Sequence, residues 1–278
     1  MEFIKKHSDK ILISAGAAAL LFGGYYLLKN KSAPVVVETQ SKSESINNVS
    51  MIFVKDDKYH TFIEKLRSIV KSELVVGDLS KNTIITINQC VIHLFKNDYV
   101  RLLLDGRRIR RKFLDNLDLY TREFNKNTTE AEKLMENASL EVLRDLNIGL
   151  TEYERSSERI MAADPNFAMF NLYMFESVKM QVPSQRNRVL TKTDLVNILN
   201  FQREQYARAD FSNLDLAPEQ LVMLKQTYAS DRASAAFDYE EEDIMKNPSL
   251  LQEPEVMEAQ RALQNTMLSE QANANYFG

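Results

Sequence analysis

Hydrophobic residues follow two different patterns along this chain. Near the start, residues 11–28 (ILISAGAAALLFGGYYLL) form one apolar run without a charged side chain. After residue 50, apolar side chains instead recur every three or four positions, with polar residues between them. The first pattern is typical of a membrane span and the second of amphipathic helices. The sequence therefore predicts an all-α protein: a single N-terminal transmembrane helix, then a multi-helix bundle with an extended helical C-terminal tail.

The apolar run is long enough to cross a membrane. As a helix, its eighteen residues span about 27 Å, close to the thickness of the hydrocarbon core. No water satisfies backbone groups there, so a helix is the expected form. Three lysines precede the run and two follow it, a margin that does not fix the orientation. The side chains that can reach the head groups are Lys5, Lys6, Lys10, Tyr25, Tyr26, Lys29 and Lys31.

Two other interpretations of the run remain open. A cleaved signal peptide has a shorter apolar region and a small-residue cleavage site, whereas the one suitable site, after Ala33, is followed by Pro34. A buried helix of a soluble protein is the other alternative. An uncleaved signal-anchor is favoured because of the length of the run and its lysine flanks.

Small residues recur every four positions within the run, at Ala15, Ala19 and Gly23. This spacing puts them on one face of a helix, where another helix can approach closely. The pattern predicts a face for helix packing in the membrane. Small residues are also common in any spanning helix, so the alternative of no specific partner stays open.

Changes in composition divide the chain into five parts. Between the run and the amphipathic region, the residues are small, polar and without helical period, as in a linker. The parts are an N-terminal flank (1–10), the anchor (11–28), a linker (32–50), a helical domain (51–237) and an acidic, amphipathic C-terminal extension (238–278).

Capping residues, glycines and prolines divide the helical domain into helices. The expected helices run from Asp56 to Gly77, from Ser80 to about Leu104, from Asp105 and Gly106 to the polar residues 125–128, and from a Thr129–Glu132 capping box to about Ile160, with a weak point at Gly149. Later helices begin at Asp164 and Pro165, at a Thr191–Asp194 capping box and at Pro218. The helix after Pro165 has aromatic and methionine side chains on more than one face, which favours a core position over a protein-binding surface.

The C-terminal extension has a different character. It begins with the acidic run 240–243, contains two further prolines and ends in a polar tail, so a compact core is not expected there. An amphipathic helix is predicted from Pro254 to about Ser269. Its residues Met257, Leu263 and Met267 are candidates for docking on a partner protein.

Charge and composition exclude some classes of function. The formal net charge is −4, and five of the basic residues flank the apolar run, so bulk charge argues against nucleic-acid binding. A single cysteine, Cys90, rules out an intramolecular disulfide and makes an oxidising compartment less favoured. Only seven glycines are present, and no glycine-rich phosphate loop, G-x-S-x-G elbow or HExxH motif is found.

Imidazole and thiol chemistry has few candidates. Cys90 and His93 are three positions apart on one helix face, a spacing that suits two metal ligands, but no second pair completes a site. His60 stands alone, and the acidic segment 210–219 lacks the glycine and the ligand spacing of a calcium loop. We therefore predict no metal, no cofactor and no enzymatic activity.

One cluster of basic residues stands out in this acidic chain. It comprises Arg107, Arg108, Arg110, Arg111 and Lys112. Such a cluster can bind anionic lipid head groups or an acidic surface of a partner. The favoured alternative is a solvated helix face whose charges pair with the neighbouring Asp105, Asp115 and Asp118.

These features together predict a non-catalytic accessory or structural subunit of a larger membrane complex. Its expected partners are membrane lipids, including anionic phospholipid, and the other subunits. A short span with lysines on both sides resembles the layout of mitochondrial signal-anchored proteins, so a mitochondrial membrane is expected, the inner one preferred. The alternative is an adaptor or receptor that displays its helical domain on an organelle surface to recruit a soluble protein. A membrane-tethered enzyme is a third class.

Overall fold

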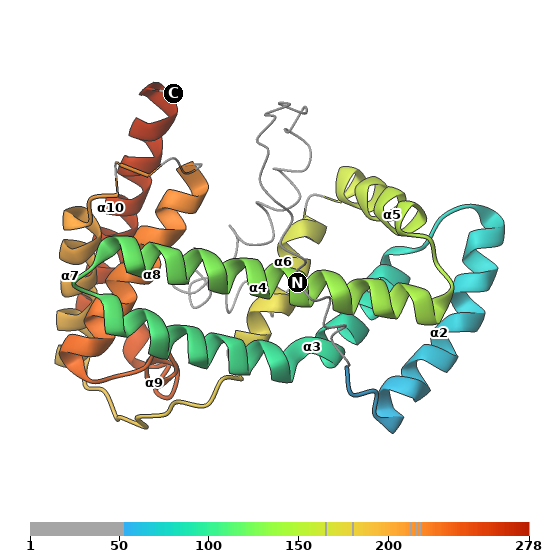
Figure 1. Ribbon diagram of the computed structural model, residues 1–278, viewed down its shortest axis with the longest axis horizontal. Helices are drawn as coiled ribbons and strands as arrows, with labels where there is room; N and C mark the ends of the chain where they lie inside the picture. The colour runs from blue at the N-terminus through green and yellow to red at the C-terminus, as the bar shows by residue number, and fades with distance from the viewer. Residues whose placement is uncertain are drawn as a thin grey trace, which may run out of the picture. The chain divides into compact units, whose positions relative to one another are not determined.

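The computed structural model describes residues 53–277, apart from 165, 180, 212, 215 and 217. This part of the chain is all-α, as predicted, and contains no strand (Figure 1). Its helices are α2 (Asp57–Val76), α3 (Lys81–Arg110), α4 (Leu117–Leu146), α5 (Leu150–Ala163), α6 (Asn166–Lys179), α7 (Lys192–Arg208), α8 (Pro218–Phe237), α9 (Glu241–Ile244) and α10 (Pro254–Phe277), with short 3-10 helices at Arg111–Phe113 and Leu250–Gln252.

The predicted N-terminal flank, anchor and linker lie outside the described residues. Among the helices that are described, none is both long enough and apolar enough to span a bilayer.

The described residues fall into two compact units. The N-terminal unit comprises residues 53–99 and 130–175, and the C-terminal unit comprises residues 100–129 and 176–278. The long helices α3 and α4 each contribute residues to both units.

Local chemistry sets the limits of α2 in the N-terminal unit. The Asp56 carboxylate accepts a hydrogen bond from the Tyr59 backbone N–H at 2.8 Å, which caps the first turn. Gly77 ends the helix with a positive φ of 129°, a conformation that glycine adopts without strain. Both limits agree with the sequence prediction. The buried face consists of Tyr59, Ile63, Leu66 and Val70.

The predicted boundary at Asp105 and Gly106 is wrong, because α3 continues through both residues to Arg110. Gly106 serves close packing: a Cβ atom there would lie 2.4 Å from Nδ2 of Asn127 on α4. The Asn127 amide in turn donates to the Leu102 carbonyl oxygen at 3.1 Å. A glycine and an asparagine that look like helix breakers in sequence therefore join two helices in the fold.

The helix boundary predicted at residues 125–128 is also wrong, because Asn127 belongs to the contact between α3 and α4. The polar residues 125–128 lie inside α4, so the Thr129–Glu132 pair is not an N-terminal cap. α4 ends at Leu146, where Asn147 has a positive φ of 57°, and α5 begins afresh at Leu150. The one long helix predicted to about Ile160 is therefore two, and the break includes the weak point predicted at Gly149.

Other helix starts agree with prediction. The Thr191 side chain accepts from the Asp194 N–H at 3.2 Å, and the Asp194 carboxylate accepts from the Thr191 N–H at 2.9 Å, which completes the capping box of α7. The Asp164 side chain accepts from the Asn166 N–H at 3.0 Å where α6 begins.

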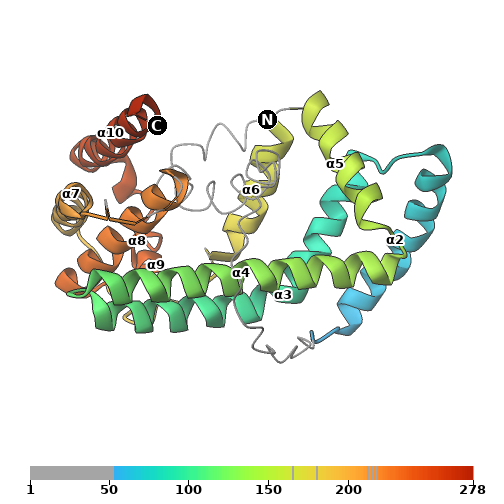
Figure 2. The same ribbon diagram turned by 45° about the horizontal axis from the view of Figure 1, so that its top comes forward.

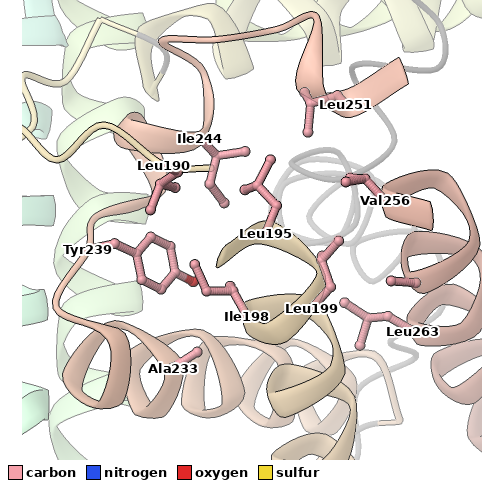
Figure 3. Packing of buried hydrophobic residues seen from close by; sticks show 11 residues of the cluster. Leu190, Leu195, Ile198, Leu199, Ala233, Tyr239, Ile244, Leu251, Val256 and Leu263 are labelled. Atoms are coloured by element: carbon pink, nitrogen blue, oxygen red, sulfur yellow. The ribbon is translucent and has the colours of Figure 1, made fainter. Parts of the chain in front are cut away.

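The C-terminal unit has a hydrophobic core at α7, which packs against both α8 and α10 (Figures 1 and 2). Figure 3 shows side chains from these helices and from the segment after α8 pointing toward one another. The cluster consists of Leu190, Leu195, Ile198, Leu199, Ala233, Tyr239, Ile244, Leu251, Val256, Ala259 and Leu263.

This core corrects the expectation that the segment after residue 238 lacks one. Tyr239, Ile244 and Val256 are buried although their spacing fits no single helix. Tyr239 precedes α9, Ile244 ends α9 and Val256 lies in the first turn of α10, so no helical period connects them in the sequence. Acidic composition is therefore compatible with a core here, because the apolar residues are held by α7.

A second cluster of the C-terminal unit joins α4 to α8. The Tyr120 and Tyr228 rings meet edge to face at 5.1 Å between centroids, and Phe211 meets Tyr228 in the same way at 5.7 Å. The Tyr228 hydroxyl donates to the Leu114 carbonyl oxygen at 3.0 Å. The cluster consists of Leu114, Tyr120, Phe124, Ala209, Phe211, Met223, Leu224 and Tyr228.

We predict that Leu263→Ala destabilises the protein by about 2 to 4 kcal/mol, because it empties part of a packed core. Leu268→Ala on the same helix is the matched control, since Leu268 is 60% exposed and Leu263 only 7%. The control should change the unfolding free energy by less than about 0.5 kcal/mol. Urea denaturation measures both, and equal effects would show that α10 is not part of the core.

Candidate functional site

The basic cluster at the end of α3 is divided between two faces of the helix. Arg107 lies three positions before Arg110 and four before Arg111, so its side chain is next to both, and burial separates these three from Arg108. The Arg110 side chain is 8% exposed, whereas that of Arg108 is 70% exposed. The last turn of a helix favours positive charge, because the carbonyl ends of its peptide dipoles collect there.

Asp231 of α8 lies at the centre of this face. Its Oδ2 accepts from the Tyr120 hydroxyl at 2.8 Å and from Arg110 Nε at 3.0 Å, and its Oδ1 accepts from Arg111 Nε at 3.1 Å. Asp231 and Arg110 are both buried. A buried carboxylate is costly unless it is paired and hydrogen-bonded, and these three donors meet that need.

The acidic run before and within α9 completes the network. Glu240 binds Arg111 with both carboxylate oxygens, at 2.6 and 2.8 Å. Arg107 donates to Glu242 at 2.7 Å and to Glu241 at 3.2 Å. Two-point guanidinium–carboxylate pairing fixes orientation as well as charge. The basic run of α3 and the acidic run near residue 240 are therefore partners within one unit.

The pKa shifts follow from burial and from these pairs. Burial favours the neutral form of Arg110, but the Asp231 carboxylate outweighs it and raises the pKa of Arg110. Burial also raises the pKa of the Tyr120 phenol, and the charge of Asp231 adds to this. Burial raises the pKa of Glu242, whose Oε2 has no hydrogen-bond partner among the described residues. The arrangement holds charges in place, with a guanidinium against each of its carboxylates.

Asp243, the last residue of the acidic run, connects this run to Ser184 and Lys246. It accepts hydrogen bonds from the Ser184 hydroxyl at 2.6 Å and from the Glu240 N–H at 2.9 Å, and it pairs with Lys246 at 2.6 Å. Burial alone would raise the pKa of Asp243, but Lys246, Ser184 and the Glu240 N–H together lower it.

Binding of anionic lipid or of an acidic partner by the basic cluster stays a prediction, and fewer of its side chains are available for it. Arg108 and Lys112 are exposed, and Arg108 pairs with Asp105 at 2.8 Å, as the solvated-face alternative expects. Asp115 pairs instead with Arg232, also at 2.8 Å. Binding of lipid or of an acidic partner would fall to the exposed pair.

The other predicted site residues are placed as follows. Ala15, Ala19 and Gly23 lie outside the described residues. Leu263 is buried in the core of the C-terminal unit, and Met267 packs against that core. Met257 is half-buried. Docking of Met257, Leu263 and Met267 on a partner protein stays a prediction. Leu263 and Met267 already contact the core of their own unit.

Cys90 and His93 do not form a pair. His93 Nε2 lies 2.9 Å from a carboxylate oxygen of Asp56, and burial raises the pKa of the Cys90 thiol to about 11. His60 is exposed and meets the edge of the Tyr59 ring. Within the described ranges, no group of three or more His, Cys, Asp or Glu side chains is placed to hold a metal ion.

A small cavity of about 180 Å³ lies beside α4 in the C-terminal unit. Ligand sites for organic molecules are usually larger, from about 300 Å³ upward. The Thr121 hydroxyl is buried there, with no hydrogen-bond partner among the described residues. The lining residues are Leu117, Asp118, Thr121, Asp210, Phe211, Asn213 and Leu214.

Sequence reasoning found the arginines but missed Tyr120, Asp231 and Glu240. One signal was present: a run of basic residues and a run of acidic residues occur in a chain with few other dense charge clusters. Their pairing could have been proposed from charge complementarity. Asp231 gave no such signal, because a single aspartate in a helix is usually exposed.

Comparison of the chain with family models, curated proteins and solved structures gives no significant match.

We predict that Arg110→Met destabilises the protein by about 3 kcal/mol or more, because it removes a partner of the buried Asp231. Arg108→Met, the same substitution two positions earlier, should cost less than about 0.5 kcal/mol. Urea denaturation of both variants measures the difference. Equal unfolding free energies would contradict the network.

We predict that Asp243→Asn lowers the unfolding free energy at neutral pH by about 2 to 3 kcal/mol, because hydrogen bonds to a charged group are lost. The pKa of Asp243 in the fold lies below its ordinary value of 3.8. Its ionised form therefore stabilises the fold fully above that pH, and this contribution is lost as the pH falls through the lowered pKa.

Urea denaturation at several pH values between about 7 and 3 tests this. The difference between the wild type and Asp243→Asn should shrink below pH 3.8. Asp57→Asn, at an exposed position, is the control. A difference that does not depend on pH would contradict the assignment.

Proposed function

We propose that this chain is a non-catalytic, single-pass membrane-anchored accessory or structural subunit of a larger membrane protein complex. The observation that carries the proposal is the uncharged run 11–28 with lysines on both sides. The corresponding fold is one transmembrane helix at the N-terminus, followed by a helical domain and a C-terminal helical segment.

The charge network supports a structural role. The densest groups of charged residues in the described ranges, near 107–112 and 238–243, bind each other and stabilise the fold. A subunit held by partners needs rigid helical surfaces, and paired buried charges help to define them. The single cysteine and the layout of the anchor favour a mitochondrial membrane, the inner one preferred.

A second candidate is an organelle-surface adaptor that recruits a soluble protein. The observation in its favour is the exposure of Met169 and Phe170 on α6, since flexible methionine and aromatic side chains suit protein-binding surfaces. Protease added to intact organelles distinguishes the two. It would remove the helical domain of a surface adaptor and leave a subunit inside an inner membrane intact.

The anchor is tested by a paired substitution. We predict that Leu20→Arg with Leu21→Arg prevents stable membrane insertion, because each arginine near the centre of a span costs about 2.5 to 3.5 kcal/mol. Leu268→Arg, at an exposed position, should leave insertion unchanged. Alkaline carbonate extraction of membranes measures the retained fraction. Retention of the paired variant would contradict a span at 11–28.

The subunit role is tested by gentle solubilisation and identification of the bound chains. We predict that Ala19→Leu inserts normally but loses about tenfold or more of a co-purifying membrane subunit, because a large side chain blocks close helix approach. Ala17→Leu, on nearly the opposite face of the helix, is the matched control. A wild-type chain that runs as a monomer without co-purifying protein would overturn the proposed role.

A further inference from the structure

The exposed side of α2 carries a line of apolar residues. Phe62, Ile69 and Val76 are seven positions apart, so they lie within about 40° of one another around the helix. Their side chains are 39%, 46% and 88% exposed. From Phe62 to Val76 the line extends about 21 Å along the helix. This line borders the buried face of α2, since Phe62 lies three positions after Tyr59 and four before Leu66.

Two lysines accompany the apolar line. Lys58 is four positions before Phe62 and Lys65 three positions after it, so both lie on the same side of the helix. Both are exposed, and Lys58 Nζ lies 6.0 Å from the centre of the Phe62 ring. The lysines and the apolar line together form what we term the α2 outer stripe: Lys58, Phe62, Lys65, Ile69 and Val76.

Acidic residues of α2 are kept away from the stripe. Asp57 and Glu64 are roughly 80° to 120° around the helix from Lys58 and Lys65. Glu73 lies closer, but its carboxylate accepts hydrogen bonds from the Ser80 N–H at 2.8 Å and the Thr83 hydroxyl at 3.0 Å. The stripe therefore presents apolar and positively charged groups to its surroundings.

We propose that the α2 outer stripe docks on the anionic surface of the bilayer. Phenylalanine and isoleucine side chains enter the boundary between head groups and acyl chains, while lysine stems lie along the apolar surface and their ammonium groups meet lipid phosphates. The charge of the stripe complements that of anionic lipid. This inference rests on the proposed anchor for proximity to the membrane.

The length of the chain before α2 supports this occupant. Residues 29–56 separate the apolar run from α2, and their first part is polar. As the linker that its composition predicts, a chain of that length has a root-mean-square span of about 30 Å. An anchor at 11–28 therefore keeps α2 at a high effective concentration near the bilayer, where a modest stripe suffices for docking.

A single tryptophan tests the docking in the full-length protein. The chain has no tryptophan, so Phe62→Trp introduces one fluorophore at the stripe. The variant is reconstituted into phosphatidylcholine vesicles with and without phosphatidylserine, each containing brominated lipid as a quencher. We expect quenching in the anionic vesicles and its loss at high salt.

Two further variants make the test specific. Adding Lys58→Gln and Lys65→Gln to Phe62→Trp should reduce the ratio of docked to undocked protein about 30-fold, since each lysine contributes about fivefold. Lys71→Trp, at an exposed position about half a turn from the stripe, should remain unquenched. Equal quenching of Phe62→Trp and Lys71→Trp would overturn the proposal.

The remaining outcomes separate this inference from the proposed function. Wild-type protein that does not float with vesicles would contradict the anchor itself. Protein that floats but whose Phe62→Trp is unquenched in both vesicles would overturn only the docking. Quenching of equal strength without phosphatidylserine would overturn the role of the lysines. Blue-shifted emission without quenching would place the stripe against protein rather than lipid, and would also overturn the proposal.

Discussion

The C-terminal unit depends on the need to neutralise the buried carboxylate of Asp231. Its three donors come from two places in the chain: Tyr120 at the start of α4, and Arg110 and Arg111 where α3 passes into the 3-10 helix. An unpaired charge in this position would cost several kcal/mol. The end of α3, the start of α4 and the middle of α8 must therefore meet at one point.

The network also connects the two hydrophobic clusters of the unit. Asp231 follows Tyr228 of one cluster by three positions and precedes Ala233 of the other by two. Glu240 follows directly after Tyr239, which is fully buried in the same cluster as Ala233. The ion pairs thus lie where α8 passes from one core to the other, and they hold the acidic run against α3. This explains how an acidic segment belongs to a compact unit.

The sequence predicted features that depend on local chemistry. Gly77 ends α2, and the Thr191–Asp194 pair caps α7, because these effects involve only neighbouring residues. The sequence prediction was wrong where a residue contacts a different helix. Gly106 and Asn127 look like helix breakers, yet each belongs to the contact between α3 and α4. Packing outweighs local propensity at such positions.

The sequence likewise predicted only part of the candidate site. The arginine run was recognised, but its three inward side chains could not be distinguished from Arg108, because that division depends on where α8 and α9 lie. In the proposed subunit, this pairing leaves the outer faces of the helices for contacts with lipid and protein. The basic run then takes part in the fold, and α2 is the described helix that follows the proposed anchor most closely in the sequence.

The pairing of the two runs is tested most directly by a double-mutant cycle on Arg111 and Glu240, which bind each other at 2.6 and 2.8 Å. Unfolding free energies are measured for Arg111→Met, Glu240→Gln, the double variant and the wild type. A coupling energy of about 1.5 kcal/mol or more is predicted for a pair in direct contact. Additivity within about 0.5 kcal/mol would contradict the account.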